Sequence, residues 1–442
     1  MGYLAELGQG FRSHALDPRQ VLEEAISQIE SLNSELCAFI NLDYANARQA
    51  ASASYERFRS GIPLGPLDGI LIGLKDLFET KGIPTTAGSQ ILCDYHPAHN
   101  AAAVETLHNA GANTFLGKLN LHEFAYGPTA TSSYFGTMKN PHDPEKMAGG
   151  SSGGSAIAVA TGMVAGALGT DTGGSVRIPA AFCGVYGLKP SYDSISRRGV
   201  IPLSWTLDHV GPIARDLDDL ELLWRILSHR MDQQVRPTNN PRVLWVTDKN
   251  LDGLDVQVQQ QMATAGERLG HLSVLEIIPG TLPRGEECRA SQQLILGAEA
   301  VNYHWAWLKT RRDEYQPDVR DRLVSHAGDL AIHYIEALRM RSELIAYYDE
   351  EVAARYDFII TPTVPIVPPS LTTTHLGGVD IRQILTSWTA PFNLLGLPAL
   401  TLPISPAGLG IGLQIVGSRG KELELLAFAH DVEATLCYTS RG

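Results

Sequence analysis

The sequence predicts a wound α/β fold, because short β-rich runs alternate with amphipathic helical stretches along most of its length. The composition supports a packed core: 44% of the 442 residues are hydrophobic and 19% are charged, which is too apolar for a disordered chain. The length corresponds to roughly two to three average domains, or to one large α/β domain with insertions.

The first half of the chain carries a clear alternation. Asp17 and Pro18 are typical of an N-cap and a first helical position, and apolar residues then recur at helical spacing as far as Ile29. We next expect strands at 70–74, 114–119 and 164–170 and helices at 101–109 and 155–162. This order is that of a sheet whose strands are connected by helices.

The second half repeats the pattern after a polar, proline-containing segment at 232–242. We expect strands at 243–246, 274–278, 358–360, 399–403 and 411–416, and helices at 256–269, across 290–355 and at 421–436. We therefore predict a single domain over residues 1–442. Its parts are an N-terminal helical region (1–60), a core (61–230), an inserted β-α-β and helical part (231–356), and C-terminal strands and a helix that complete the core (357–442).

Charge and composition narrow the location and the partners. The net charge of −13 disfavours nucleic acid, and the longest apolar stretch, residues 156–168, is too short to span a bilayer. No signal peptide is visible after Met1, and the five scattered cysteines indicate neither a disulfide framework nor a zinc ribbon. We expect a cytoplasmic monomer or homodimer that acts on a small molecule and binds neither membranes nor nucleic acid.

Two glycine-rich segments, 149–155 and 170–177, are the most unusual local features. A flexible turn, a phosphate cradle and a nucleophilic hydroxyl beside backbone N–H donors are three explanations for such segments. The phosphate cradle is disfavoured, because Gly117-Lys118 lacks the Ser or Thr and the upstream glycine of a P-loop, and no G-x-G-x-x-G motif opens a helix. The turn and the nucleophile both remain open at this point.

Ser175 is the candidate nucleophile. The expected strand ends near Thr170 and residues 172–174 form a turn, so that Ser175 begins a helix. Backbone N–H groups and the positive end of the helix dipole would then face the space before Ser175, where they stabilise an oxyanion. A plain N-cap serine is the structural alternative.

A nucleophilic serine needs a base, and Lys75 is the candidate. It ends the apolar run at 70–74, where burial would lower the pKa of its amine toward that of a general base. An exposed lysine at a strand end is the alternative. The G-x-S-x-G matches at 149–153 and 150–154 suggest instead an α/β-hydrolase, but the late histidine, His430, lies in a helical run and in the wrong order with its acid.

A series of motifs then occurs in order along the chain. They are Gly73-Leu74-Lys75-Asp76, residues 84–89, Glu123-Phe124-Ala125-Tyr126-Gly127, Asn140-Pro141, residues 149–155 and 169–177, Cys183-Gly184, residues 187–190 and 207–212, Asn393, and residues 396–399 and 411–414. Over roughly residues 21–436 the chain resembles the amidase signature family. It looks most like the branch that contains the A subunits of glutamyl-tRNA amidotransferases together with carboxybiuret hydrolases.

The resemblance implies the amidase signature fold, a large mixed β-sheet covered by helices on both faces. It also implies a hydrolase that cleaves a carbon–nitrogen amide bond through an acyl-enzyme, with Ser175 as nucleophile, Ser151 as bridging serine (usually after a cis peptide bond) and Lys75 as base. The implied oxyanion hole consists of the N–H groups of Thr172, Gly173, Gly174 and Ser175, and the implied supporting residues are Ser152, Asp171 and Arg177. No metal and no organic cofactor is implied.

The substrate is a separate question. In the amidotransferase, an Asp shortly before the T-x-P-x-N-L segment, residues 389–394 here, helps to hold the head group of glutamine. Thr386 stands about where that Asp should be, and Arg322 matches its partner arginine. We therefore expect a stand-alone hydrolase of a small apolar or aryl amide or carbamate (urethane).

Tyr126, Trp205 and Trp388 are the candidate walls of such a pocket, although each could equally be a core aromatic residue. Two other functions stay open: the A subunit of a glutamine-dependent amidotransferase, and a hydrolase of carboxybiuret or another urea derivative. A catalytically silent interaction protein is disfavoured, because Lys75, Ser151 and Ser175 are all present.

Overall fold

The computed structural model describes residues 1–235, 237–246, 255–272, 275–405 and 408–436. The predicted strand at 274–278 starts at a residue outside this part of the chain, and Cys437 lies outside it altogether. The described strands are β1 (Phe39–Leu42), β2 (Ile72–Lys75), β3 (Gly117–Leu119), β4 (Gly166–Asp171), β5 (Tyr186–Lys189), β6 (His209–Ala214), β7 (Arg242–Val246), β8 (Glu276–Gly280), β9 (Phe358–Pro362), β10 (His375–Leu376), β11 (Val379–Asp380), β12 (Ala399–Pro403) and β13 (Gly412–Gly417).

Among the described residues, eleven of these strands form one sheet in the order β1-β3-β2-β4-β6-β5-β12-β13-β9-β7-β8, and β10 and β11 form a separate antiparallel pair. The large sheet is mixed. Strand β2 is parallel to both β3 and β4, and β7 is parallel to both β8 and β9. The strands from β4 to β9 pair antiparallel.

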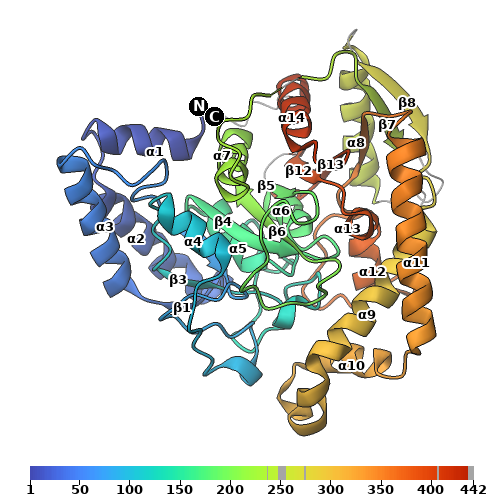
Figure 1. The fold of residues 1–442 in the computed structure, drawn as a ribbon, viewed down its shortest axis with the longest axis horizontal. Helices are drawn as coiled ribbons and strands as arrows, with labels where there is room; N and C mark the ends of the chain where they lie inside the picture. The colour runs from blue at the N-terminus through green and yellow to red at the C-terminus, as the bar shows by residue number, and fades with distance from the viewer. Residues whose placement is uncertain (236, 247–254, 273–274, 406–407, 437–442) are drawn as a thin grey trace.

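The described α-helices are α1 (Tyr3–Arg12), α2 (Pro18–Leu36), α3 (Tyr44–Arg59), α4 (Ala102–Asn109), α5 (Gly153–Ala160), α6 (Arg177–Cys183), α7 (Leu217–Leu227), α8 (Val256–Gly270), α9 (Gly285–Thr310), α10 (Pro317–His326), α11 (Ala331–Tyr347), α12 (Ile381–Thr386), α13 (Ala390–Leu395) and α14 (Glu422–Leu436). The helical region expected across 290–355 is divided into α9, α10, α11 and short helical turns, because Gln316-Pro317 and Gly328 interrupt it. Figure 1 shows α1, α2 and α3 at one end of the molecule and α9, α10 and α11 at the other.

Helices cover both faces of the sheet, which confirms the predicted fold class. Successive strand residues point to opposite faces, and in β4 Leu168 joins an apolar cluster with Leu223 of α7 and Leu425 of α14. Its neighbour Ala167 joins a different cluster with Ile157 of α5. The core therefore consists of separate apolar layers on the two sides of the sheet.

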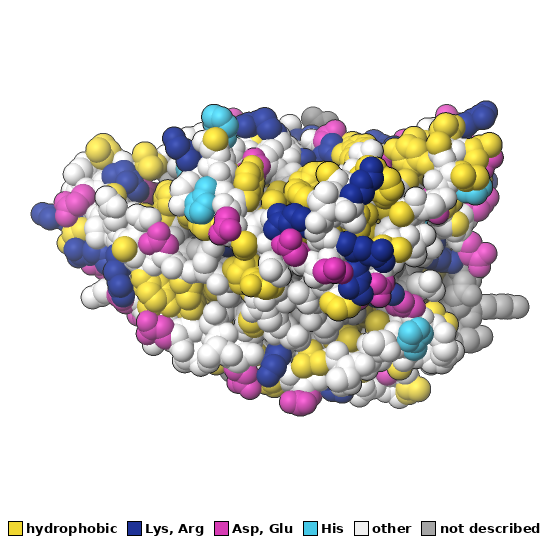
Figure 2. Space-filling model, turned by 90° about the horizontal axis from the view of Figure 1, so that it is seen from below, with side chains coloured by type: hydrophobic (Ala, Val, Ile, Leu, Met, Phe, Trp, Pro, Cys, Tyr) yellow, Lys and Arg dark blue, Asp and Glu magenta, His cyan; other side chains and the backbone are white. Residues whose placement is uncertain are grey.

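Strands from both sides of residue 231 share this sheet, since β7 and β8 extend it beyond β9. We propose on this ground that the chain is one domain whose segment 231–356 extends the sheet and adds the helices α9 to α11. No helix in the described ranges combines the length and the apolar character needed to cross a bilayer. On the face seen in Figure 2, acidic and basic side chains are interspersed.

The parallel pairing of β2 with β4 positions the site. Carboxyl ends of parallel strands meet at the same edge of a sheet. Lys75 is the last residue of β2 and Asp171 the last residue of β4, so the two residues, distant in sequence, lie at one edge of the sheet.

Candidate active site

Lys75 lies at this edge with its side chain completely buried. Its Nζ is 2.7 Å from Ser151 Oγ and 2.8 Å from Thr170 Oγ1. Burial lowers the pKa of the Lys75 ammonium to about 7, against the opposing effect of the Asp171 and Asp208 carboxylates. A substantial fraction of the amine is therefore neutral near pH 7, and the neutral form is the one that accepts a proton.

Three hydroxyl groups, those of Ser151, Ser152 and Thr170, surround this amine. Ser152 Oγ, 2.9 Å from Lys75 Nζ, donates its own proton to the carbonyl of Thr170 at 3.2 Å, so it accepts from the amine. A neutral amine has two N–H donors and one lone pair. Ser152 Oγ accepts one of these N–H groups, so the lone pair of the neutral amine faces the hydroxyl of Ser151 or that of Thr170, and either hydroxyl can donate to it.

Ser151 and Ser175 come from neighbouring loops that are joined through the backbone. Ser151 precedes α5, its peptide bond with Gly150 is cis, and its carbonyl accepts from the His122 N–H at 3.1 Å. Ser175 follows the turn after β4, and its carbonyl accepts from the Ser152 N–H at 3.1 Å. The Ser175 side chain lines a cavity, and its hydroxyl has no hydrogen-bond partner within the described part of the chain.

Two glycines allow these loops to pack closely against neighbouring segments of the chain. Gly174 has φ of +131°, and a Cβ there would lie 2.2 Å from Thr389 Oγ1. A Cβ at Gly150 would lie 2.8 Å from the backbone nitrogen of Ala130. Only glycine fits at either position. These two glycines therefore serve close packing.

Asp171 and Arg177 hold the turn that carries Ser175. Both side chains are completely buried, and Arg177 Nη2 lies 2.8 Å from Asp171 Oδ1. The Asp171 carboxylate also accepts the N–H groups of Gly174 at 2.9 Å and Val176 at 3.1 Å. Burial raises the pKa of Asp171, but the guanidinium of Arg177 outweighs it and holds the pKa below its ordinary value. The carboxylate stays ionised and orders the turn.

This arrangement differs from two expectations about the oxyanion hole. Helix α6 begins at Arg177, two residues after Ser175, and the N–H groups at its start face Asp171. The Gly174 N–H is also taken by Asp171. By contrast, the N–H groups of residues 172, 173 and 175 make no hydrogen bond to any described residue. Those three donors remain available to an oxyanion.

Ser175 opens into a cavity of about 330 Å³. The polar and charged side chains that line it are Thr172, Gln292, Gln293, Arg322, Ser325, His326, Asp380, Arg382, Gln383 and Thr386. Ala125, Tyr126, Pro128, Leu203 and Leu296 add an apolar part to the lining. The cavity is therefore more polar than predicted, because most of its polar side chains come from α9, α10 and α12, whose position relative to Ser175 cannot be obtained from sequence spacing.

Arg322 of α10 is a cation of this cavity that has no carboxylate partner among the described residues. Its guanidinium lies 4.0 Å from the centre of the Tyr126 ring and donates to the Tyr126 carbonyl at 2.8 Å. Tyr126 thus lines the cavity, as predicted, although its role there is to support a cation. Asp380 and Arg382 also line the cavity, but they bind each other, with Asp380 Oδ2 2.5 Å from Arg382 Nη2.

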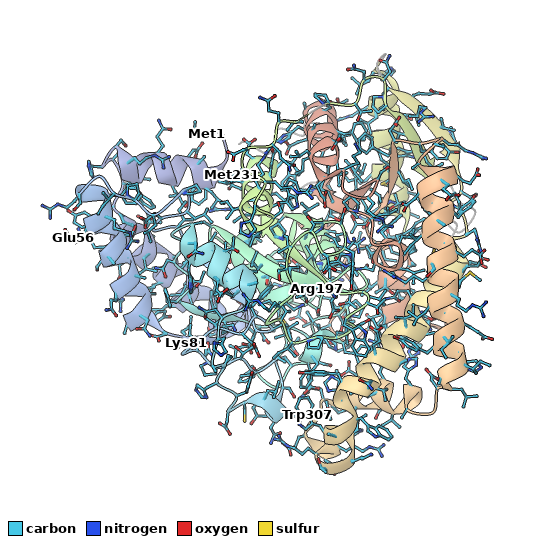
Figure 3. The ribbon with its side chains drawn as sticks, viewed as in Figure 1. Met1, Glu56, Lys81, Arg197, Met231 and Trp307 are labelled. Atoms are coloured by element: carbon cyan, nitrogen blue, oxygen red, sulfur yellow. The ribbon has the colours of Figure 1, made fainter. Side chains whose placement is uncertain are left out.

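Trp205 and Trp388 do not line this cavity, so their prediction as its walls is wrong. Trp388 is buried in the apolar core. Trp205 is 43% exposed and borders a second hollow, of about 690 Å³, which Arg197 and Asp208 also line. Arg197, labelled in Figure 3 on the loop before β6, donates to the Trp205 carbonyl. Sequence alone does not distinguish a core aromatic from a pocket aromatic.

Several residues at the site were missed by sequence reasoning. Asp208 lies within the quoted motif at 207–212, which could have indicated it. Its carboxylate accepts from Thr172 Oγ1 at 2.6 Å. Gln292 and Asp380 belong to no motif, and no local signal could have found them.

The α/β-hydrolase alternative requires a histidine side chain beside Ser151 Oγ, and among the described residues no histidine side chain hydrogen-bonds to it. His430 of α14 faces acidic residues of α7, with its Nε2 3.7 Å from Glu221 Oε2, and this contact raises the pKa of the imidazole. Ser151 instead contacts Lys75. Within the described residues, no cluster of three or more His, Cys, Asp and Glu side chains is placed to hold a metal ion.

Comparison with known proteins agrees with this geometry. The amidase family model matches residues 20–426. The A subunit of glutamyl-tRNA(Gln) amidotransferase from Lachnospira eligens is 33% identical over 468 residues, covering 97% of each chain. A crystal structure of an amidase superposes with a TM-score of 0.91 at 35% identity, covering 99% of this chain and 100% of the other. A structure of a vestigial protein complex that reveals the evolutionary origins of an s-triazine catabolic enzyme has a TM-score of 0.87 at 31% identity, covering 98% of both. The chain therefore belongs to the amidase signature family, whose members hydrolyse carbon–nitrogen bonds of amides.

Proposed function

We propose that this amidase uses Ser175 as nucleophile, Ser151 as proton relay and Lys75 as base. The observation that carries the proposal is the 2.7 Å contact between the buried Lys75 amine and Ser151 Oγ, in loops that adjoin Ser175. Burial supplies the neutral amine that the role requires. The surrounding hydroxyl of Ser152 holds that amine in place.

The proposed reaction proceeds through an acyl-enzyme. Ser175 Oγ attacks the amide carbon and passes its proton to Ser151, whose own proton moves to Lys75. The carbonyl oxygen becomes an oxyanion that faces the N–H groups of residues 172, 173 and 175. The proton then returns through Ser151 to the leaving nitrogen, the carbon–nitrogen bond breaks, and an ester of Ser175 remains. Water hydrolyses this ester by the same relay, and Ser175 recovers its proton.

The proposed relay requires the Ser175 hydroxyl to donate to Ser151 in the substrate complex. The two loops are already held together by the hydrogen bond from the Ser152 N–H to the Ser175 carbonyl. Catalytic hydrogen bonds without substrate are often long and tighten in the substrate complex. The free hydroxyl of Ser175 in the cavity is consistent with such a resting state.

The cavity favours a substrate whose acyl part ends in a carboxylate. Arg322 reaches the same cavity as Ser175 and has no described carboxylate partner, so an anionic group of the substrate would complete its environment. Arginine binds carboxylates with two parallel hydrogen bonds. A cavity of about 330 Å³ accommodates a small acyl group between the two residues.

An amino-acid head group fits less well than a simple carboxylate. Asp380 is the carboxylate of the cavity that could hold an ammonium group, but Arg382 already binds both of its oxygens. Thr386, which lines the cavity, offers no charge. This favours a stand-alone hydrolase of a monoamide of a short dicarboxylic acid, or of a carboxylated carbamate or urea, over a glutaminase. Amide, carbamate and urea carbonyls fit the same oxyanion donors.

The second candidate is an amidotransferase component that works inside a complex. It is favoured by the curated relatives, which are A subunits of glutamyl-tRNA(Gln) amidotransferases and share 33–35% of their residues with this chain. Activity of the isolated chain separates the two candidates. Hydrolysis without any partner supports the stand-alone enzyme, whereas glutamine hydrolysis that requires added partner proteins supports the amidotransferase.

The test uses the purified chain with succinyl-p-nitroanilide, which joins a carboxylate-bearing acyl group to a chromogenic leaving group. Butyryl-p-nitroanilide, of equal acyl length but without the carboxylate, is the matched substrate. A fluorophosphonate should label Ser175 in peptide mapping, and Ser175→Ala should abolish turnover while the exposed-site control Ser31→Ala keeps it. Labelling at Ser151 instead of Ser175 would overturn the proposed roles.

A further inference from the structure

Thr172 is held at two of its atoms by residues outside the catalytic loops. Its side chain is buried, and its Oγ1 donates to Asp208 Oδ1 at 2.6 Å. Its carbonyl accepts from Gln292 Nε2 at 3.1 Å. Thr172 is the first residue of the turn that presents the free N–H groups to Ser175, so both contacts act on the position of that turn.

The contact with Gln292 sets the direction of one oxyanion donor. In a trans peptide the C=O and the following N–H point in opposite directions. The Thr172 carbonyl is directed to Gln292, so the N–H of Gly173 points away from α9. The Gly173 carbonyl is in turn bound by Thr389 Oγ1 at 2.6 Å. The peptide between Thr172 and Gly173 is therefore constrained on both sides.

Both holding residues are buried and are themselves supported. Gln292 is 4% exposed and comes from α9. Asp208 is 7% exposed, precedes β6, and accepts the N–H groups of Leu203 and Ser204 at 3.0 Å and 3.1 Å. The Asp208 carboxylate is therefore used in hydrogen bonds to Thr172, Leu203 and Ser204. The Gln292 amide is used in the hydrogen bond to the Thr172 carbonyl.

One face of helix α9 carries Gln292 and also supports the loop of Asp208. Glu299 lies seven residues after Gln292, two helical turns further along the same side. Its carboxylate accepts from Ser204 Oγ at 2.6 Å and from the Thr206 N–H at 3.0 Å. Ser204 and Thr206 lie in the loop that leads to Asp208. Helix α9 therefore fixes the Thr172 carbonyl directly, through Gln292, and the Thr172 hydroxyl indirectly, through this loop and Asp208.

We propose that Gln292 and Asp208 are positioning residues that together orient the Thr172–Gly173 peptide toward the carbonyl oxygen under attack. The inference rests on the proposed function of Ser175. Neither residue transfers a proton in this scheme. Through Gln292 and Glu299 of α9, the segment 231–356 helps to position the proposed oxyanion donors.

Because Asp208 is charged and Gln292 is neutral, replacing them should have different effects on the pH dependence of activity. Asp208 faces Lys75 of β2 and Thr172 after β4, and Arg197 of its own loop acts on it as well. Asp171 also faces Lys75. Burial raises the pKa of Asp208 to about 6, so its carboxylate is mostly ionised at pH 7, where Lys75 titrates. Loss of this charge removes one of the two carboxylates that stabilise the Lys75 ammonium, so the acid limb of the pH profile should move to lower pH. Loss of the neutral Gln292 amide should leave that limb in place.

The experiment measures kcat, KM and the pH profile of the full chain on succinyl-p-nitroanilide. Gln292→Met keeps the volume of the side chain and removes the donor; Asp208→Asn keeps the shape and removes the charge. Each should lower kcat by about tenfold or more, since misplacement near 1 Å costs about a hundredfold. KM should change by less than about twofold for Asp208→Asn, which does not line the Ser175 cavity, and only this variant should shift the acid limb.

Matched controls are Gln260→Met on the exposed side of α8 and Asp313→Asn, an exposed carboxylate in the short helical turn after α9. The inference is overturned if Gln292→Met and Asp208→Asn both turn over at the control rate. It is also overturned if both lose kcat only in proportion to lost folded protein, measured by circular dichroism. If Asp208→Asn does not fold, Gln292→Met alone decides.

Failure of this inference is distinguishable from failure of the proposed function. If Ser175→Ala retains turnover, the proposed function fails whatever the positioning variants do. If Ser175→Ala is inactive but Gln292→Met keeps the control kcat, only the positioning inference fails.

Discussion

The amine of Lys75 lies 2.7 Å from the hydroxyl of Ser151, although 76 residues separate the two in the sequence. The parallel pairing of β2 with β4 brings them together, because Lys75 ends β2 and the loop of Ser151 packs against the end of β4. The contact is completely buried, so it depends on the charge state of the lysine.

Replacing Lys75 by Met should lower kcat/KM on succinyl-p-nitroanilide by about a thousandfold, because a positioned general base contributes about a hundredfold to ten-thousandfold. Steady-state kinetics checks this expectation. Lys81→Met, at an exposed lysine in the loop after β2, is the control and should retain wild-type activity. A Lys75→Met enzyme within about fivefold of wild type is incompatible with the proposed base.

Activity should rise with pH through about 7. The Lys75 pKa is lowered from its ordinary value to about 7 by burial, so the ammonium predominates below that pH and the base is blocked. Above it, the neutral amine predominates and kcat/KM should level off. A profile of log kcat/KM should therefore have a slope of about +1 below the midpoint and a plateau above it. A flat profile across the midpoint would contradict the role of a titrating lysine.

Replacing Arg322 by Met should raise KM for succinyl-p-nitroanilide by about tenfold to a hundredfold, which corresponds to the loss of about 1.5–3 kcal/mol for hydrogen bonds to a charged group. Butyryl-p-nitroanilide should be affected much less, because it offers no carboxylate. The control is Arg320→Met on the same helix, since Arg320 binds Asp321 rather than the cavity. Equal effects on both substrates would remove the carboxylate from the proposed substrate class.

Replacing Arg177 by Met should lower the free energy of unfolding by about 3–5 kcal/mol, because it leaves the buried Asp171 carboxylate without its cation. Urea denaturation at pH 7 measures this. The control is Arg198→Met, which breaks the exposed pair with Glu105 and should cost less than about 1 kcal/mol. Comparable midpoints for the two variants would show that the buried pair adds little stability.

The ion pair between Arg177 and Asp171 also predicts how the free energy of unfolding depends on pH. The pKa of Asp171 is below its ordinary value in the folded chain, so its stabilising contribution is present above the unfolded pKa of about 3.9 and is lost as the pH falls through the lower folded value. In Arg177→Met this acid-side loss should shrink, since the carboxylate no longer gains a cation on folding. Unfolding free energies measured from neutral to acid pH test the difference.

Elements with a strong local signal were predicted well. The N-cap at Asp17 and the helix after it, and the strand that leads to the Thr172 turn, agree with α2 and β4 because capping and apolar runs act over neighbouring residues. The start of α6 was placed two residues too early, since the sequence does not show that Asp171 folds back onto the N–H groups of Val176 and Arg177. That carboxylate, and not the helix dipole, organises the turn.

By itself, the sequence determined the fold class and the family, and it predicted Lys75, Ser151 and Ser175 as the reacting residues, because motifs and periodicity are local in the chain. Only the tertiary structure decided what surrounds Ser175. It placed Arg322 and Gln292 in the cavity and left Trp205 and Trp388 out of it. The physical reason is that pocket walls are set by how distant helices pack on the sheet, and packing depends on the shape and contacts of the whole core rather than on spacing along the chain.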